Sequence, residues 1–133
     1  MADDEIIIGV DLGGTKIMTG AVNSSGAILG FPVKVPTQGN DSADNIFGRI
    51  VSSIERVLTS LDVSAGQVKG IGVGATGPLD IEKGLILECP QLPNMHFFNL
   101  REAVEDHFGI LVKLNNDANC LILGESVYGV GAK

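Results

Sequence analysis

The sequence has few cysteines, and their arrangement suits neither a disulfide framework nor a metal site. Its two cysteines, Cys89 and Cys120, lack the C-x-x-C spacing of redox and zinc motifs. The two histidines, His96 and His107, stand apart from them in sequence, so no segment has the ligand spacing of a zinc site. We therefore predict two reduced thiols with a structural role.

Basic residues are also scarce. Nine Lys and Arg residues stand against sixteen Asp and Glu residues, giving a formal net charge of −7, and the nine form no cluster. Proteins that bind nucleic acids neutralise phosphates with clustered Lys and Arg side chains. The composition therefore argues against a nucleic acid as a partner of this chain.

Long apolar runs and a targeting signal are absent as well. No stretch approaches the roughly 18 apolar residues of a membrane-spanning helix. Asp3, Asp4 and Glu5 occupy the place where a signal peptide carries positive charge. We expect no membrane association and a cytoplasmic location.

The chain does contain enough apolar residues to build one domain. It has 133 residues, of which 44% are hydrophobic, and its 18 glycines are scattered among strand-like segments, as in a protein with many tight turns. The first third predicts a three-stranded antiparallel meander over residues 5–12, 15–23 and 27–35.

A long helix is predicted next. Asp41 or Ser42 can cap it, and apolar residues then recur at helical spacing. They are Ile46, Ile50, Ile54, Leu58 and Leu61. A second apolar strand follows over residues 68–75, in which glycines alternate with Ile71 and Val73. These glycines have two interpretations: a functional role, or simply small residues that let the long helix pack closely.

The remaining predicted elements are a turn (76–80), a short strand (84–88), a proline-rich loop (90–94), a helix, a strand (110–114) and a last helix (115 to about 128). Asn99 and Glu102 have capping-box spacing and open the first of these helices, which Gly109 ends. The order βββ-α-β-α-β-α predicts an α/β fold, a mixed sheet with helices on its faces, in which strands 5–12, 68–75 and 110–114 are neighbours.

The segment around the first strand end carries groups that bind phosphate. A β-branched strand delivers Asp11, and a turn then supplies Gly13, Gly14, Thr15 and Lys16. The glycines permit φ > 0 and let backbone N–H groups approach a ligand closely, and we expect Asp11 to hold a hydrated Mg²⁺. The alternative is a plain hairpin with Asp11 merely polar, since the spacing is not that of a P-loop.

Two further polar segments, Thr76-Gly77-Pro78 and Asn116-Asp117, also follow apolar strands. Ligands of open α/β sheets bind at the carboxyl ends of the strands, so the convergence of three such segments predicts a binding site there. Asp117 alone would be interpreted as a helix N-cap. The adjacent Asn116 favours a site, because the pair can hydrogen-bond two sugar hydroxyls.

These motifs resemble the N-terminal half of the ROK family of sugar kinases and sugar-responsive repressors, over essentially the whole chain and in the same order. The resemblance implies an actin-like, RNase H-like fold, with ATP, Mg²⁺ and a hexose as ligands. It implies that Asp11, Gly13, Gly14, Thr15 and Lys16 form the first phosphate loop, with Asp11 near Mg²⁺ and contacting it through water. Gly77, Gln91, Asn116 and Asp117 then correspond to positions that contact the sugar.

Asp117 corresponds to the general base that takes the proton of the attacking hydroxyl. An ordinary aspartate, with a solution pKa of about 4, suffices, because phosphoryl transfer through a loose transition state needs proton removal only late.

Three departures from the family pattern blur the identity of the sugar. Thr76 stands where the family often has proline, Gln91 where asparagine is common, and Asn115 where glutamate often precedes Asn-Asp. Asn94 follows Gln91 by three residues and is expected to be a polar loop residue.

Family members continue past the point where this sequence stops, into a second phosphate loop, an adenosine pocket and a His/Cys zinc motif. We therefore expect residues 1–133 to be an N-terminal sugar-kinase domain of a homo-oligomeric, glucokinase-like protein, inactive alone, with any zinc in the other half. The first strand begins close to Met1, without the helix-turn-helix of the repressors, which favours a kinase over a sugar-sensing regulator. A third alternative is another protein of the actin-like fold, such as a carboxylate kinase or a chaperone ATPase, and the Asn116-Asp117 pair argues against it. ATP and polyphosphate both remain possible donors.

Overall fold

A computed structural model of the chain describes residues 5–75 and 77–116. Its elements, in chain order, are β1 (Ile6–Leu12), β2 (Lys16–Asn23), β3 (Ile28–Pro36), α1 (Ala43–Ser60), the 3₁₀ turn η2 (Ala65–Gln67), β4 (Val68–Ala75), β5 (Leu79–Asp80), β6 (Leu85–Ile86), the 3₁₀ turn η3 (Pro93–Met95), α2 (Leu100–Phe108) and β7 (Val112–Asn115). The predicted meander, long helix and later strands are confirmed within a few residues.

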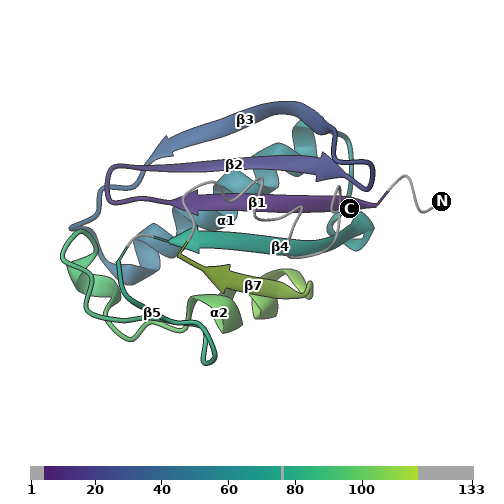
Figure 1. The fold of residues 1–133 in the computed structure, drawn as a ribbon. Coiled ribbons are helices and arrows are strands. Elements are labelled where there is room, and N and C mark those ends of the chain that lie inside the picture. The colour runs from purple at the N-terminus through teal and green to yellow at the C-terminus, as the bar shows by residue number, and fades with distance from the viewer. Residues whose placement is uncertain (1–4, 76, 117–133) are drawn as a thin grey trace.

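Within the described residues, the strands form a five-stranded mixed sheet in the order β3-β2-β1-β4-β7, while β5 and β6 pair in a separate small hairpin. β2 is antiparallel to both β1 and β3, whereas β1, β4 and β7 run parallel to one another. The predicted neighbours are therefore confirmed. The carboxyl ends of the three parallel strands meet at one edge of the sheet, on the left in Figure 1.

Helix α1 begins where its sequence predicts. Ser42 is the N-cap, and its hydroxyl accepts a hydrogen bond from the Asn45 N–H at 3.1 Å. Of the two predicted caps, Asp41 is therefore not the N-cap residue itself. The helix buries one apolar stripe against the sheet, made of Ile46, Ile50, Val51, Ile54, Val57 and Leu58.

Helix α2 also has the predicted ends and lies beside α1. Asn99 caps it by accepting from the Glu102 N–H at 2.9 Å, and Gly109 ends it in the left-handed conformation, at φ 68°. The ring of His107 packs edge-on against Phe47 of α1, with centroids 6.2 Å apart. The two helices therefore cover the same face of the sheet.

Strand β7 extends one residue further than predicted. Asn115 is its last residue, so the last helix does not begin at Asn115 as expected. The rest of that predicted helix, with Asp117 and Cys120, lies outside the described residues.

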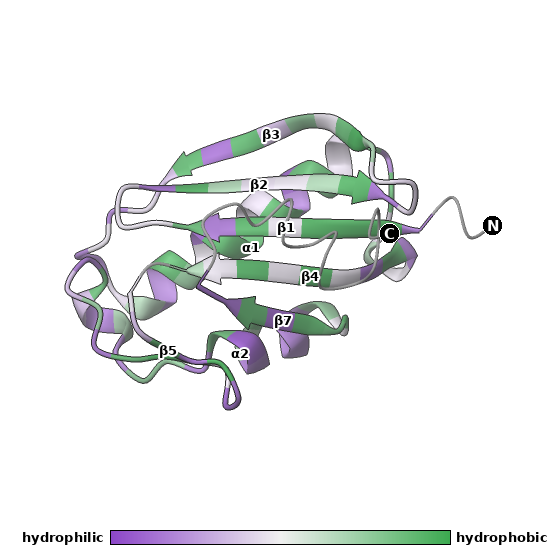
Figure 2. Cartoon of the chain, viewed as in Figure 1, coloured by the Kyte–Doolittle hydropathy of each residue, from purple (hydrophilic) through white to green (hydrophobic). Residues whose placement is uncertain are grey.

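The alternating glycines of β4 do not lie under α1. Ile71 and Val73 belong to the buried cluster that contains the α1 stripe, so Gly70, Gly72 and Gly74, which alternate with them, point to the opposite face. The interpretation in which these glycines let the long helix pack closely is therefore wrong. Figure 2 shows that β1 is hydrophobic along most of its length and hydrophilic near its carboxyl end.

Within residues 5–75 and 77–116, no helix has the length and apolar character needed to cross a membrane.

Candidate functional site

Three loops that are distant in sequence meet at the carboxyl edge of the sheet. They are the β1–β2 hairpin loop (Gly13 to Thr15), the segment from Thr37 to Asp41 that leads into α1, and the loop at Pro90 and Gln91. Together they border an open pocket of about 380 Å³, lined by Gly14, Thr15, Gly39, Asn40, Pro90 and Gln91. The predicted phosphate loop and Gln91 thus share one pocket.

The contact between these loops explains two of the glycines. A Cβ atom at Gly14 would lie 2.6 Å from the Gln91 Cβ, and one at Gly39 would lie 2.2 Å from the Gln91 carbonyl oxygen. Real Cβ atoms do not come so close to other heavy atoms, so both positions require glycine. Neither Gly13 nor Gly14 lies in the left-handed region, and the predicted reason for this pair, φ > 0, is therefore wrong. Close backbone approach is the reason for Gly14.

The hairpin loop presents backbone donors to this pocket. The Gly13 N–H is used within the loop, where it donates to the Lys16 carbonyl at 3.0 Å. In the described part of the chain, the N–H groups of Gly14 and Thr15 have no hydrogen-bond acceptor. Thr15 and Lys16 are exposed. Free backbone N–H groups beside a lysine suit the oxygens of a phosphate.

Asp11 lies beside the hairpin loop on the glycine-lined face of the sheet. Its register partner on β4 is Gly74, whose partner on β7 is Asn115. Side chains in register on neighbouring strands share a face, so Asp11 and Asn115 flank a residue without a side chain, about 10 Å apart. The Asp11 carboxylate is therefore next to a surface that a ligand can approach closely.

The turn after β4 is joined to the end of β7. Gly77 has φ +84°, and a Cβ atom there would lie 2.6 Å from the Cys89 sulfur. Both the backbone conformation and the lack of space therefore require glycine at this position. The side-chain Nδ2 of Asn116 donates to the Gly77 carbonyl at 2.8 Å. Two predicted sugar-contacting residues, Gly77 and Asn116, are thus in direct contact.

Cys89 is buried. It also has contacts that the sequence did not indicate. Its Sγ donates to Gln91 Oε1 at 3.3 Å, and its side chain packs against the turn at Gly77. Cys89 therefore packs between the turn and the loop that carries Gln91. The Asn94 side chain donates to the carbonyl oxygens of Asn40 and Asp41, at 2.7 and 3.1 Å. The interpretation of Asn94 as a loop residue is confirmed.

Arg49 and Asp41 form an ion pair that sequence reasoning missed. Arg49 Nη2 lies 2.5 Å from Asp41 Oδ2, and Asp41 Oδ1 accepts from the Asn45 side chain and the Ser42 N–H. The hydrogen bond from Arg49, followed by those from Asn45 and Ser42, lowers the pKa of Asp41 from 3.8 to about 2. Asp41 lies before the N-cap Ser42 and so outside α1, and no helical spacing in the sequence signals this pair.

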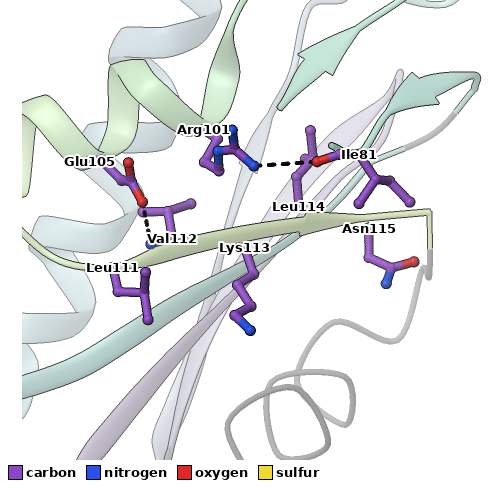
Figure 3. A pocket seen from close by; sticks show the side chains of 8 residues that line it. All are labelled: Ile81, Arg101, Glu105, Leu111, Val112, Lys113, Leu114 and Asn115. Atoms are coloured by element: carbon purple, nitrogen blue, oxygen red, sulfur yellow. Dashed lines mark hydrogen bonds between the residues drawn. The ribbon is translucent and has the colours of Figure 1, made fainter. Parts of the chain in front are cut away.

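A second hollow, of about 510 Å³, lies along the outer edge of β7 (Figure 3). There Glu105 of α2 accepts from the Val112 N–H at 3.1 Å, and Arg101 donates to the Ile81 carbonyl at 3.3 Å. The carboxylate occupies a backbone donor of the edge strand, which limits pairing with another chain. Although larger, this hollow contains none of the predicted site residues.

No group of three or more His, Cys, Asp or Glu side chains within residues 5–75 and 77–116 is placed to hold a metal ion directly. A single carboxylate such as Asp11 suits a Mg²⁺ that keeps most of its water ligands. Asp117, the predicted base, lies outside the described residues.

Comparison with known proteins identifies the family. The profile of the ROK family matches residues 7–133. The glucokinase of Thermotoga maritima is 35% identical over 126 residues, which are 94% of this chain and 38% of that protein. The chain thus spans little more than a third of the length of this relative.

Solved structures give the same result. A ROK family glucokinase from Streptomyces griseus, in complex with glucose and AMPPNP, superposes with a TM-score of 0.70 at 32% identity, over 95% of this chain and 38% of that one. A ROK family transcriptional regulator, a homologue of the E. coli MLC protein, has a TM-score of 0.76 at 19% identity, over 96% of this chain and 31% of the regulator. The second similarity is one of fold alone.

Proposed function

The chain belongs to the ROK family, and from that premise we propose that it is the N-terminal domain, residues 1–133, of an ATP-dependent hexose kinase of the glucokinase type. The reaction is transfer of the γ-phosphoryl group of ATP to a sugar hydroxyl. The observation that carries the proposal is the contact of Asn116 with Gly77. These two predicted sugar-contacting residues lie at the same edge of the sheet as the predicted phosphate loop.

The nucleotide is proposed to bind at the hairpin loop. The N–H groups of Gly14 and Thr15 lack acceptors in the described part of the chain, and Lys16 adds a positive charge, so the loop suits phosphate oxygens. Gly13 closes the turn, and Asp11 would hold Mg²⁺ through its water ligands. The metal ion would supply neutralisation of the negative charge on the phosphates.

The sugar is proposed to bind beside this loop. Gly77, Gln91, Asn116 and Asp117 would contact its hydroxyl groups, the first three from positions joined through Cys89 and the Asn116–Gly77 hydrogen bond. Asp117 would accept the proton of the attacking hydroxyl. From the same reading we infer a cytoplasmic, homo-oligomeric full-length protein without a nucleic-acid partner, with any zinc ion held outside this chain.

The test is hexose-dependent release of ADP by the full-length protein. We expect ATP turnover that requires both Mg²⁺ and one member of a panel of glucose, mannose and N-acetylglucosamine, with polyphosphate assayed as an alternative donor. Sugar binding without any phosphorylated product would instead favour a sugar-sensing regulator. The 133-residue chain alone should be inactive, because kinases of this kind close two domains around their substrates.

A further inference from the structure

Thr37 is a buried residue that holds two carbonyl groups of the hairpin loop. Its side chain is fully buried. Its Oγ1 donates to the Gly13 carbonyl at 2.7 Å, and its backbone N–H donates to the Thr15 carbonyl at 2.9 Å. A single residue from the segment before α1 therefore fixes the loop at two alternate peptide units.

Fixing these carbonyls also fixes the direction of two N–H groups. In a trans peptide unit, the C=O of one residue points opposite to the N–H of the next. Because the Gly13 and Thr15 carbonyls point toward Thr37, the N–H groups of Gly14 and Lys16 are directed away from it. The structure thus orients the Gly14 donor before any anion binds, and donors with a fixed orientation bind developing charge without reorganisation.

Arg49 in turn holds the segment that carries Thr37. Its Nη1 donates to the Thr37 carbonyl at 2.9 Å, and its Nη2 donates to Asp41 Oδ2 at 2.5 Å and Gln38 Oε1 at 3.3 Å. Gln38 has φ 53°, an unfavourable conformation for a residue other than glycine. The Arg49 guanidinium therefore connects α1 to a segment with one strained residue.

We propose that Thr37 is a positioning residue for the phosphate loop and that Arg49 acts through it. Neither side chain reaches the ligand, because Thr37 is buried and the guanidinium of Arg49 is occupied by the segment. Their effect is on the orientation of the Gly13-to-Lys16 peptides, and so on use of the phosphate donor rather than of the sugar. This inference rests on the proposed kinase function.

The decisive pair of variants is Thr37→Val and Thr37→Ser in the full-length protein. Valine keeps the shape of threonine but cannot donate to Gly13, whereas serine keeps the donor. We expect Thr37→Val to lower kcat/KM for ATP by about 10- to 100-fold, the cost of misplacing a binding group slightly, with the sugar KM unchanged. Thr37→Ser should restore most of the activity. Equal kcat/KM for ATP in the two variants would overturn the proposal.

Arg49→Gln tests whether Arg49 acts through Thr37, and it leaves the buried Thr37 side chain unchanged. It should lower kcat/KM for ATP in the same way. Arg56 is an exposed arginine on the same helix, and Arg56→Gln should leave kcat/KM unchanged for both ATP and the sugar. A drop in sugar affinity equal to that for ATP would contradict a role confined to the phosphate loop.

A readout without turnover separates this inference from the proposed function. In the ¹⁵N-labelled 133-residue chain, inorganic triphosphate with Mg²⁺ should shift the amide signal of Gly14, the donor that Thr37 orients, at a series of triphosphate concentrations. Thr37→Val should abolish these shifts, while Thr37→Ser should retain them. If the full-length protein phosphorylates no hexose, the kinase proposal fails, but these shifts still decide the role of Thr37. Shifts that are identical in Thr37→Val and the unaltered chain would refute it.

Discussion

The side-chain amide of Asn116 donates to the carbonyl oxygen of Gly77 at 2.8 Å, across 39 residues of sequence. This bond joins the turn after β4 to the residue after β7. Gly77 cannot be replaced without strain, because its φ is +84° and Cys89 lies behind it. The position of the turn at Gly77 relative to the end of β7 therefore depends on the side-chain amide of Asn116.

Asn116→Asp should weaken sugar binding in the full-length protein. A carboxylate cannot donate to the Gly77 carbonyl, and two oxygens of partial or full negative charge would repel each other. We expect the sugar KM to rise by about 10-fold, in line with losing a hydrogen bond and leaving its partner unpaired, with the KM for ATP little changed. Asn115→Asp is the matched control, since Asn115 Oδ1 only accepts, from the Asn116 N–H, and an aspartate can still do so. Equal effects of the two variants would contradict the prediction.

Gly14→Ala should destabilise the chain through a clash with one identified side chain. The new Cβ would lie 2.6 Å from the Gln91 Cβ, and overpacking of this kind costs about 1–3 kcal/mol. The double variant Gly14→Ala/Gln91→Gly should recover most of the loss, because it removes the opposing atoms. Gly48→Ala is the control, as nothing lies within 4 Å of its Cβ position on α1, and it should stabilise by about 0.5–1 kcal/mol. Urea denaturation of the four proteins measures these differences, and a double variant no more stable than Gly14→Ala would exclude the clash.

The sequence predicted the elements well because their signals are local. The apolar stripe of α1, the caps Ser42 and Asn99 and the ending at Gly109 are each encoded within a few residues, and all are observed. The convergence of the segments after β1, β4 and β7 also followed, since parallel strands bring their carboxyl ends to one edge.

The contacts between loops could not be predicted in this way. Periodicity shows which face of an element is apolar, but it does not show that Gln91 will lie against Gly14 and Gly39. The sequence therefore suggests positive φ at Gly14, where the structure shows a close contact instead. It also leaves open that the β4 glycines face α1, whereas they lie on the opposite face of the sheet. The link from Arg49 through Thr37 to the hairpin loop was missed for the same cause, because it depends on the path of a loop.

The ion pair of Asp41 makes stability depend on acid pH. The folded-state pKa is about 2, below the ordinary value of 3.8, so the contribution of the charged carboxylate is present above about pH 4 and is lost as pH falls toward 2. Asp41→Asn should therefore be less stable than the unaltered chain at pH 7, and the difference should shrink toward zero by about pH 2. Asp44→Asn, an exposed acidic residue of the first turn of α1, controls for charge at the helix N-terminus. A stability difference for Asp41→Asn that is independent of pH would show that its charge does not matter.

A buried hydroxyl pair between β2 and α1 should respond asymmetrically to substitution. Ser53 Oγ donates its one proton to the Ile50 carbonyl at 2.8 Å, so the 2.7 Å contact with Thr19 must have Thr19 as the donor. Ser53→Ala then leaves the buried Thr19 hydroxyl without an acceptor and should cost about 1–3 kcal/mol, whereas Thr19→Val leaves the Ser53 donor satisfied and should cost less. In the double variant, the valine should recover part of the loss caused by Ser53→Ala. Additive effects in this cycle would show that the two hydroxyls do not interact.

Asp117→Asn tests the proposed chemistry most directly. The amide keeps the shape of the side chain and some of its hydrogen bonds to a sugar, but it cannot take the proton of the attacking hydroxyl. Loss of a general base costs about 10²- to 10⁴-fold in rate, so kcat of the full-length protein should fall by that amount while the sugar Kd, measured by calorimetry, changes much less. Asp106→Asn makes the same chemical change at an exposed position of α2 and should leave both quantities unaltered. Retention of more than about a third of the turnover would mean that another group accepts the proton, since a base that contributes so little is not acting as one. A weaker sugar Kd with an unchanged kcat would instead assign Asp117 to binding alone.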